Sequence, residues 1–136
     1  ITLALKAGED PAELARRLPR TDVVPFESEH RFMATLHHDD DGRAWVLCKG
    51  APEAVLALGA ADDGDWPQRV HAAAADGERV LAVARAEVPA DRRTITLRDL
   101  PDLEVVGMVG IMDPPRDEAA EAVAECRRAG VRVVMV

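Results

Sequence analysis

Residues 32–50 read FMATLHHDDDGRAWVLCKG, and this stretch decides the fold of the first part of the chain. The runs at 32–36 and 43–48 are mostly apolar, and the segment between them, 37–42, is polar and ends in glycine. Two short apolar runs on either side of a polar, glycine-containing turn are typical of a β-hairpin. The stretch therefore predicts two antiparallel strands joined by a turn.

Further elements follow on both sides of this hairpin. Apolar and β-branched runs predict strands at 23–26, 79–88 and 103–111. Helices are predicted at 10–17, 52–58 and 70–75, the first two because proline stands in the first turn and the third because Asp76-Gly77 follows it. This order of elements indicates an α+β fold over residues 1–112, an antiparallel sheet flanked by helices.

The pattern changes after residue 112. The prolines of Asp113-Pro114-Pro115-Arg116 stiffen the backbone, and residues 117–129 form an amphipathic pattern with acidic residues early and arginines late. The apolar run VRVVMV at 131–136 then resembles a buried strand of a parallel α/β sheet. We therefore expect a hinge and the start of a second domain, a helix and a strand, at 113–136.

Composition limits the possible functions. The chain has 136 residues, a net charge of −8 and only 3% aromatic residues, which argues against a nucleic-acid surface. The longest apolar stretch, 105–112, is far shorter than the ~20 residues of a membrane span.

The two cysteines, Cys48 and Cys126, form neither a disulfide framework nor a metal-ligand pattern, so we expect free thiols. The start at Ile1 without Met and the end inside an apolar run suggest a piece of a longer chain.

The segment Lys49-Gly50-Ala51-Pro52-Glu53 is the first candidate binding site. A strand delivers a cation, glycine permits close approach to the backbone, and proline begins a helix with free N–H groups. These features suit a phosphate or nucleotide at the edge of a sheet. The alternative is a plain strand-to-helix turn with a solvated lysine. Lys49 and Lys6 are the only lysines among 17 basic residues, which favours a specific need for an ammonium group at position 49.

Two other segments could contact a nucleotide. Phe26 could stack on a base with Arg31 near its phosphates, although Phe26 could equally be a core residue, as we expect for Phe32. Arg79 begins a mostly apolar strand, where its partner could be a structural carboxylate or a phosphate.

Two acidic clusters are poor candidates for metal sites. His37, His38 and the aspartates at 39–41 lie in a predicted turn without fixed ligand spacing, so a solvated loop tip is expected. Glu118, Glu121 and Glu125 lie near one face of a predicted surface helix. No metal site is therefore predicted. The sequence also contains no P-loop, Rossmann or G-x-S-x-G motif.

An ordered series of segments resembles P-type cation-transporting ATPases, most closely the calcium- and sodium-pump branch. The segments are PFESEHRFMATL, WVLCKGAPEAVL, GERVLAVA, LEVVGMVGIMDPPR and ECRRAGVRVVMV. The resemblance implies that residues 1–112 are the nucleotide-binding domain and that 113–136 begin the phosphorylation domain. It also implies an ATP site, with Mg-ATP as the ligand in the parent protein. In that site Phe26 would stack on adenine, Leu81 would pack on adenine, and Arg79 would contact the phosphates. Lys49 and Gly50 would lie at the bottom of the adenosine pocket, and Arg31 stands near the nucleotide where the family usually has lysine.

The resemblance also implies what this chain lacks. The phosphorylated aspartate of the D-K-T-G-T motif and the T-G-D segment are absent, so no catalytic residue is expected here. We expect the chain to hold ATP for phosphorylation of an aspartate outside it, as a cytoplasmic domain of a pump in the cell membrane. Its expected partners are ATP and the remaining phosphorylation, actuator and membrane domains, and its exposed C-terminal strand could pair with a second copy of the chain.

Two alternative functions stay open at this point. One is a small haloacid-dehalogenase-like phosphatase, suggested by the C-terminal helix and strand but without a D-x-D motif at the end of any predicted strand. The other is a nucleotide-free structural or regulatory domain, in which Phe26 belongs to the core and Arg79 to a salt bridge.

Overall fold

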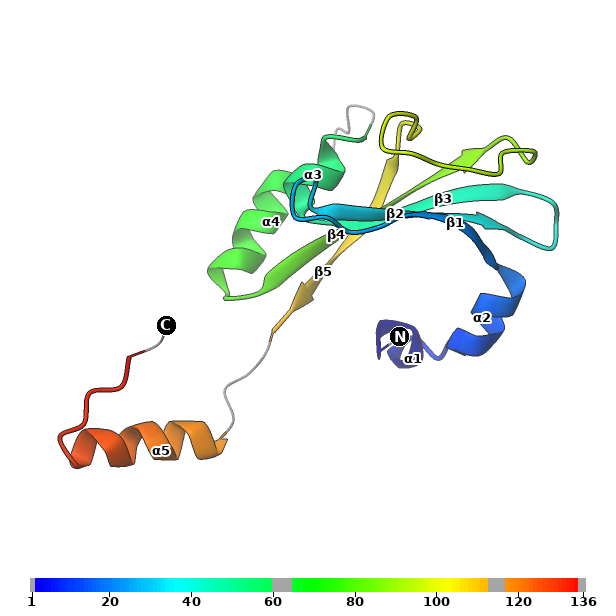
Figure 1. Ribbon diagram of the computed structural model, residues 1–136. Coiled ribbons are helices and arrows are strands. Elements are labelled where there is room, and N and C mark those ends of the chain that lie inside the picture. The colour runs from blue at the N-terminus through cyan, green and yellow to red at the C-terminus, as the bar shows by residue number, and fades with distance from the viewer. Residues whose placement is uncertain (1, 60–64, 113–116, 135–136) are drawn as a thin grey trace.

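A five-stranded antiparallel sheet is the centre of the computed structural model, which describes residues 2–59, 65–112 and 117–134. The strands follow one another in space in chain order, from β1 to β5 (Figure 1). Their bounds are β1 Arg20–Val24, β2 Phe32–His38, β3 Ala44–Gly50, β4 Arg79–Val88 and β5 Glu104–Ile111. The predicted α+β fold with an antiparallel sheet flanked by helices is confirmed.

Five helices accompany the sheet in the described residues: α1 Thr2–Lys6, α2 Pro11–Arg17, α3 Pro52–Leu56, α4 Trp66–Ala75 and α5 Asp117–Arg128. Figure 1 shows α3, α4 and the connection between β4 and β5 above the sheet, and α1 and α2 on its lower side. Helix α2 begins as expected, because the Asp10 side chain accepts a hydrogen bond from the N–H of Ala12 and Pro11 occupies the first turn. None of these helices is long and apolar enough to span a membrane.

Strict alternation along the central strands separates a buried face from an open one. From Phe32 to Leu36 in β2 and throughout β3 every second residue is buried, and the residues between are half-buried or exposed. This period of two is what a sheet with one covered face requires. The core combines the covered face with residues of α3 and of the β4–β5 connection: Val24, Phe32, Ala34, Leu36, Ala44, Val46, Cys48, Val55, Ala82, Ala84, Val88, Ile95 and Leu103.

The hairpin is longer than the sequence predicted. Strand β2 continues through His37 and His38, which pair with Trp45 and Ala44, so the turn is confined to residues 39–43. Gly42 has a φ of 79°, a conformation that glycine adopts without strain. The prediction that both histidines lie in a solvated loop tip was therefore wrong. Their rings bond to neighbours instead, that of His37 to the Leu18 carbonyl and that of His38 to the Thr21 hydroxyl.

The connection between β4 and β5 contributes core residues that local patterns did not reveal. Ile95 and Leu103 are 4% and 1% exposed. The N–H of Ile95 donates to the carboxylate of Asp22 in β1 at 2.8 Å, which ties the connection to the edge strand. Hydrogen bonds from two backbone N–H groups, first that of Ile95 and then that of Val23, lower the pKa of Asp22. The irregular connection between β4 and β5 therefore covers part of the sheet and contributes to its core.

The C-terminal part agrees with the prediction only for its helix. Helix α5 is present, but residues 131–134 are irregular and exposed rather than a buried strand. A strand needs a neighbour for its backbone groups, and none lies beside this segment among the described residues. The predicted hinge, Asp113 to Arg116, lies outside the described residues.

Candidate functional site

The segments that carry the predicted nucleotide contacts meet at one end of the sheet. Antiparallel pairing places the end of β1, the start of β2, the end of β3 and the start of β4 together, with Phe32, Gly50 and Ala82 in one row across three strands. The loop 25–31 leaves β1 at this end and carries Phe26 and Arg31. Residues separated by more than fifty positions in the sequence thus lie within one region.

Three of the predicted residues lie on the open face of the sheet. Lys49 pairs with Met33 on one side and with Val83 on the other. Leu81 and Arg79 are two and four residues before Val83, so their side chains point to the same face. Met33, Leu81 and Val83 are half-buried, whereas Lys49 and Arg79 are exposed. This end of the face therefore combines a partly exposed apolar floor with two cations, which suits a ligand with a flat apolar ring and an anionic group.

At Gly50 the structure shows a packing reason for glycine that the sequence did not reveal. It lies on the buried face, one residue beyond Lys49. A Cβ added there would lie 2.5 Å from the Arg31 carbonyl oxygen and 2.5 Å from the Phe32 Cβ. The absent side chain therefore makes room for Phe32 and for the backbone of residue 31.

Phe26 lies outside the strand predicted for it. Strand β1 ends at Val24, and Phe26 is 59% exposed in the loop that follows. Phe32, by contrast, is 6% exposed and belongs to the core, as predicted. The exposed position of Phe26 leaves its ring available to a flat ligand and disfavours the interpretation as a core residue.

Arg31 forms an ion pair beside the end of β3. Its Nη1 lies 2.6 Å from Glu53 Oε1 in the first turn of α3. Its carbonyl accepts a hydrogen bond from the N–H of Ala51 at 2.9 Å, and its φ is 58°. Glu53 was quoted in the sequence motif but not predicted as a functional residue. The two side chains become neighbours through the pairing of Phe32 with Gly50, which no local sequence pattern revealed.

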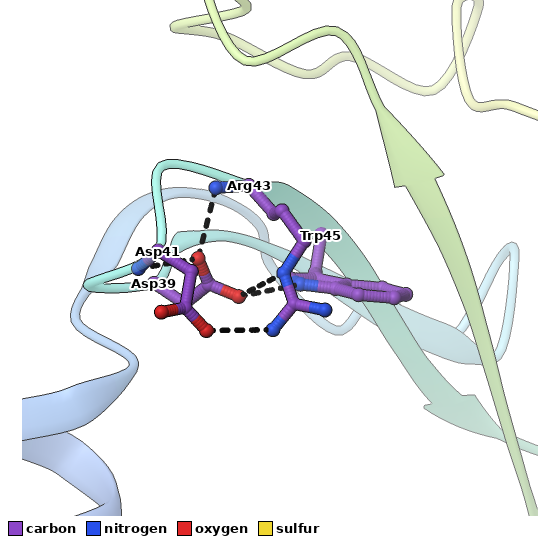
Figure 2. Close-up of polar contacts among 4 residues, drawn as sticks. All are labelled: Asp39, Asp41, Arg43 and Trp45. Carbon is purple, nitrogen blue, oxygen red and sulfur yellow. Dashed lines mark hydrogen bonds and ion pairs between the residues drawn. The ribbon is translucent and has the colours of Figure 1, made fainter.

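The opposite end of the sheet is held by a polar network around Asp39 (Figure 2). Asp39 accepts hydrogen bonds from the N–H groups of Asp41 and Arg43 and from the indole of Trp45. Arg43 also pairs with Asp39 at 2.9 Å and with Asp41 at 3.1 Å. These aspartates close a turn, and no group of His, Cys, Asp or Glu in the described part of the chain has the arrangement to hold a metal.

The network predicts a pH-dependent contribution of Asp39 to stability. The N–H of Arg43, followed by the Trp45 indole and the Arg43 guanidinium, lowers the pKa of Asp39, although burial acts in the opposite direction. A carboxyl whose pKa is lowered by folding stabilises the fold above its ordinary pKa, and this contribution is lost as the pH falls through the lowered value. We expect Asp39→Ala to lower Tm at pH 7 and to have less effect as the pH approaches about 3. Asp40→Ala is the matched control, and an equal loss of Tm in both variants at all pH values would contradict this role.

Two hollows in the described structure lie apart from the predicted contacts. One, of about 410 Å³, lies between α2 and the turn at 39–43. The other, of about 440 Å³, lies between α4 and strand β5. Neither is lined by any of the six predicted site residues. The predicted site is therefore an open sheet face with a flanking loop rather than either of these hollows.

Cys48 does not contribute its thiol to this site. Cys48 precedes Lys49 but points into the core, and burial raises the pKa of its thiol to about 11. A thiol with such a pKa is protonated at neutral pH and is a poor nucleophile.

The sequence matches P-type ATPases. Residues 1–61 match the family model of the P-type ATPase cytoplasmic domain N. The chain is 39% identical over 145 residues to a cation-transporting ATPase of Synechocystis, which covers 98% of this chain and 16% of the relative. It is 30% identical over 149 residues to a calcium-transporting ATPase of Listeria monocytogenes, covering 100% of this chain and 17% of the relative. A sodium/potassium exporting P-type ATPase of Schizosaccharomyces pombe is 40% identical over 124 residues, covering 82% and 12% respectively.

These matches define the class of protein that the chain is similar to, the P-type ATPases. They support the chain as a P-type ATPase fragment, with the domain N match in its first 61 residues. The chain spans 16% of the length of its Synechocystis relative.

Proposed function

We propose that this chain binds ATP on the open face of its sheet and positions it for phosphorylation of an aspartate elsewhere in a longer pump. The observation that carries the proposal is the common location of Lys49, Arg79 and Leu81 on one face at one end of the sheet. Phe26 is exposed in the loop at the same end. The half-buried apolar side chains and the exposed ring of Phe26 suit the base of a nucleotide, and the two cations suit its phosphates.

The remaining features of this function are part of the same proposal. Residues 1–112 would form domain N, and 113–136 would begin the phosphorylation domain. In the parent protein, ATP would arrive as Mg-ATP, and the chain would lie on the cytoplasmic side of the cell membrane. Positioning is the contribution required of such a domain, because holding the reacting groups in line supplies much of the rate of phosphoryl transfer.

Titration with ATP followed by backbone NMR tests this function directly. We expect a Kd of about 0.1 mM or weaker, equivalent to about −5 kcal/mol, because an open face makes few contacts. ATP and ADP should bind within about threefold of each other, since the base contributes more than the γ-phosphate. Resonances near Phe26, Lys49 and Arg79 should shift. If millimolar ATP shifts none of them, the chain is a nucleotide-free domain and the proposal is wrong.

Replacing Lys49 with alanine should weaken ATP binding by about fivefold to tenfold without unfolding the chain. Its ammonium is exposed on the open face, so its loss removes a charge-assisted contact and no core packing. Isothermal titration and thermal unfolding would measure the two effects. Lys6→Ala, which removes the only other lysine, is the matched control and should change neither. A Lys49→Ala chain that loses its fold would favour a structural role for this residue.

A further inference from the structure

The ion pair between Arg31 and Glu53 lies at the same end of the sheet as the proposed nucleotide site. At 2.6 Å it is the shortest ion pair in the described part of the chain. Both side chains are more than half exposed, at 53% and 60%. Glu53 stands in the first turn of α3, immediately after the strand that carries Lys49.

This ion pair is not needed to hold the two segments together. The N–H of Ala51 already donates to the Arg31 carbonyl, and the N–H of Arg31 donates to the Glu27 carbonyl at 2.8 Å. Exposed ion pairs contribute little to stability, because water solvates both groups well in their absence. What the pair does fix is the direction of the Arg31 guanidinium and the charge that it presents.

A carboxylate and a phosphate compete for the same guanidinium. Arginine offers a planar set of N–H donors that binds either anion with two parallel hydrogen bonds. With Glu53 on Nη1, part of that set is occupied, and a phosphate approaching Arg31 meets a negative charge beside it. Lys49 and Arg79 differ from Arg31, because neither has an ion-pair partner among the residues described here.

We propose that Glu53 is a built-in competitor that holds Arg31 and thereby lowers the affinity of the site for the phosphate groups of a nucleotide. The proposal rests on the ATP-binding function proposed above. Glu53 would then be a positioning residue, which acts through Arg31. It would lower the contribution of the phosphates to binding relative to that of the base. Removing its charge should therefore strengthen binding, whereas removing a nucleotide contact weakens it.

The test compares Glu53→Gln with the unmodified 136-residue chain by titration with ATP and with adenosine. We expect Glu53→Gln to bind ATP about twofold to fivefold more tightly, the effect of relieving one exposed charge pair, and to bind adenosine unchanged. High salt should reduce the gain, because exposed charges are screened. Glu53→Asp, which keeps the charge, should restore most of the lower affinity for ATP.

Two controls separate competition from other effects. Glu104→Gln removes the same charge from another exposed pair, with Arg85 at 3.3 Å and exposures of 50% and 70%, and should leave the affinity for ATP unchanged. In an Arg31→Gln background, Glu53→Gln should give no gain. A merely structural role would change Tm but not the ratio of ATP to adenosine affinity.

The outcomes distinguish this proposal from the one on which it rests. If the unmodified chain binds ATP but Glu53→Gln binds it equally or more weakly, the competitor role is wrong and ATP binding stands. An equal gain for adenosine, or an equal gain in Glu104→Gln, also overturns it. If the unmodified chain does not bind ATP at millimolar concentration, both proposals are wrong.

Discussion

Replacing Phe32 with alanine should lower the free energy of unfolding by about 3–5 kcal/mol, the usual cost of deleting a buried aromatic side chain. Phe32 is 6% exposed and begins β2 opposite Gly50. Its ring also meets that of His30 edge to face at 4.7 Å between centroids. Alanine keeps the Cβ that lies beside Gly50 but removes the ring, so the truncation would leave a cavity in the core.

Urea denaturation followed by circular dichroism would measure this loss. Phe26→Ala is the matched control, because it removes the same side chain from an exposed loop and should cost less than about 0.5 kcal/mol. A loss below about 1 kcal/mol for Phe32→Ala would show that the ring is not part of the core. Because Phe32 precedes Met33 and follows Arg31, its loss should also weaken ATP binding indirectly by loosening the end of the sheet.

The sequence predicted the strands best where local and non-local preferences agree. Strand β4 was predicted at 79–88, and the structure gives Arg79–Val88. The run combines β-branched residues with alternating burial, and β4 lies between two neighbours that satisfy its backbone on both edges. The 131–136 run has a similar composition, yet its described residues 131–134 form no strand. Composition alone thus identified a strand preference in both runs, and pairing decided which of them became a strand.

The cover of the sheet was harder to predict, because it depends on contacts that are distant in the sequence. Ile95 is buried through a bond from its backbone to Asp22, 73 residues earlier. Nothing in the polar sequence around residues 89–103 has a regular period that would mark a covering segment. The same limit applies to Glu53, whose partner Arg31 becomes a neighbour only after β2 and β3 have paired.

The candidate site was predicted from residue types, and the structure adds which face each residue occupies. Lys49 and Gly50 are adjacent in sequence, and the sequence argument assigned both to one ligand. In a strand, adjacent residues point to opposite faces, so Lys49 is on the open face and Gly50 is buried. Gly50 therefore makes room for Phe32 and for the backbone of residue 31, whereas Lys49 is the one of the two whose side chain lies on the open face.

Replacing Phe26 with alanine should weaken ATP binding by about 1–3 kcal/mol, the range found when an aromatic side chain that stacks on a base is removed. The fold should not change, because Phe26 is 59% exposed and follows the end of β1. Phe26→Trp, which keeps a flat ring, should retain most of the affinity, whereas Phe26→Leu should lose most of it despite a similar apolar character.

Adenosine is the informative ligand for this series, since it lacks the phosphates that Lys49 and Arg79 would contact. If Phe26 stacks on the base, its loss should reduce the affinity for adenosine and for ATP by the same factor, whereas Lys49→Ala should affect ATP more than adenosine. Nucleotide titrations of the two variants and of the double variant would measure this difference. If the ratio of ATP affinity to adenosine affinity is the same in Phe26→Ala and Lys49→Ala, the two residues do not separately recognise the base and the phosphates. Loss of ATP affinity in Phe26→Ala with adenosine unchanged would place the ring beside the phosphates and contradict its role as the base platform.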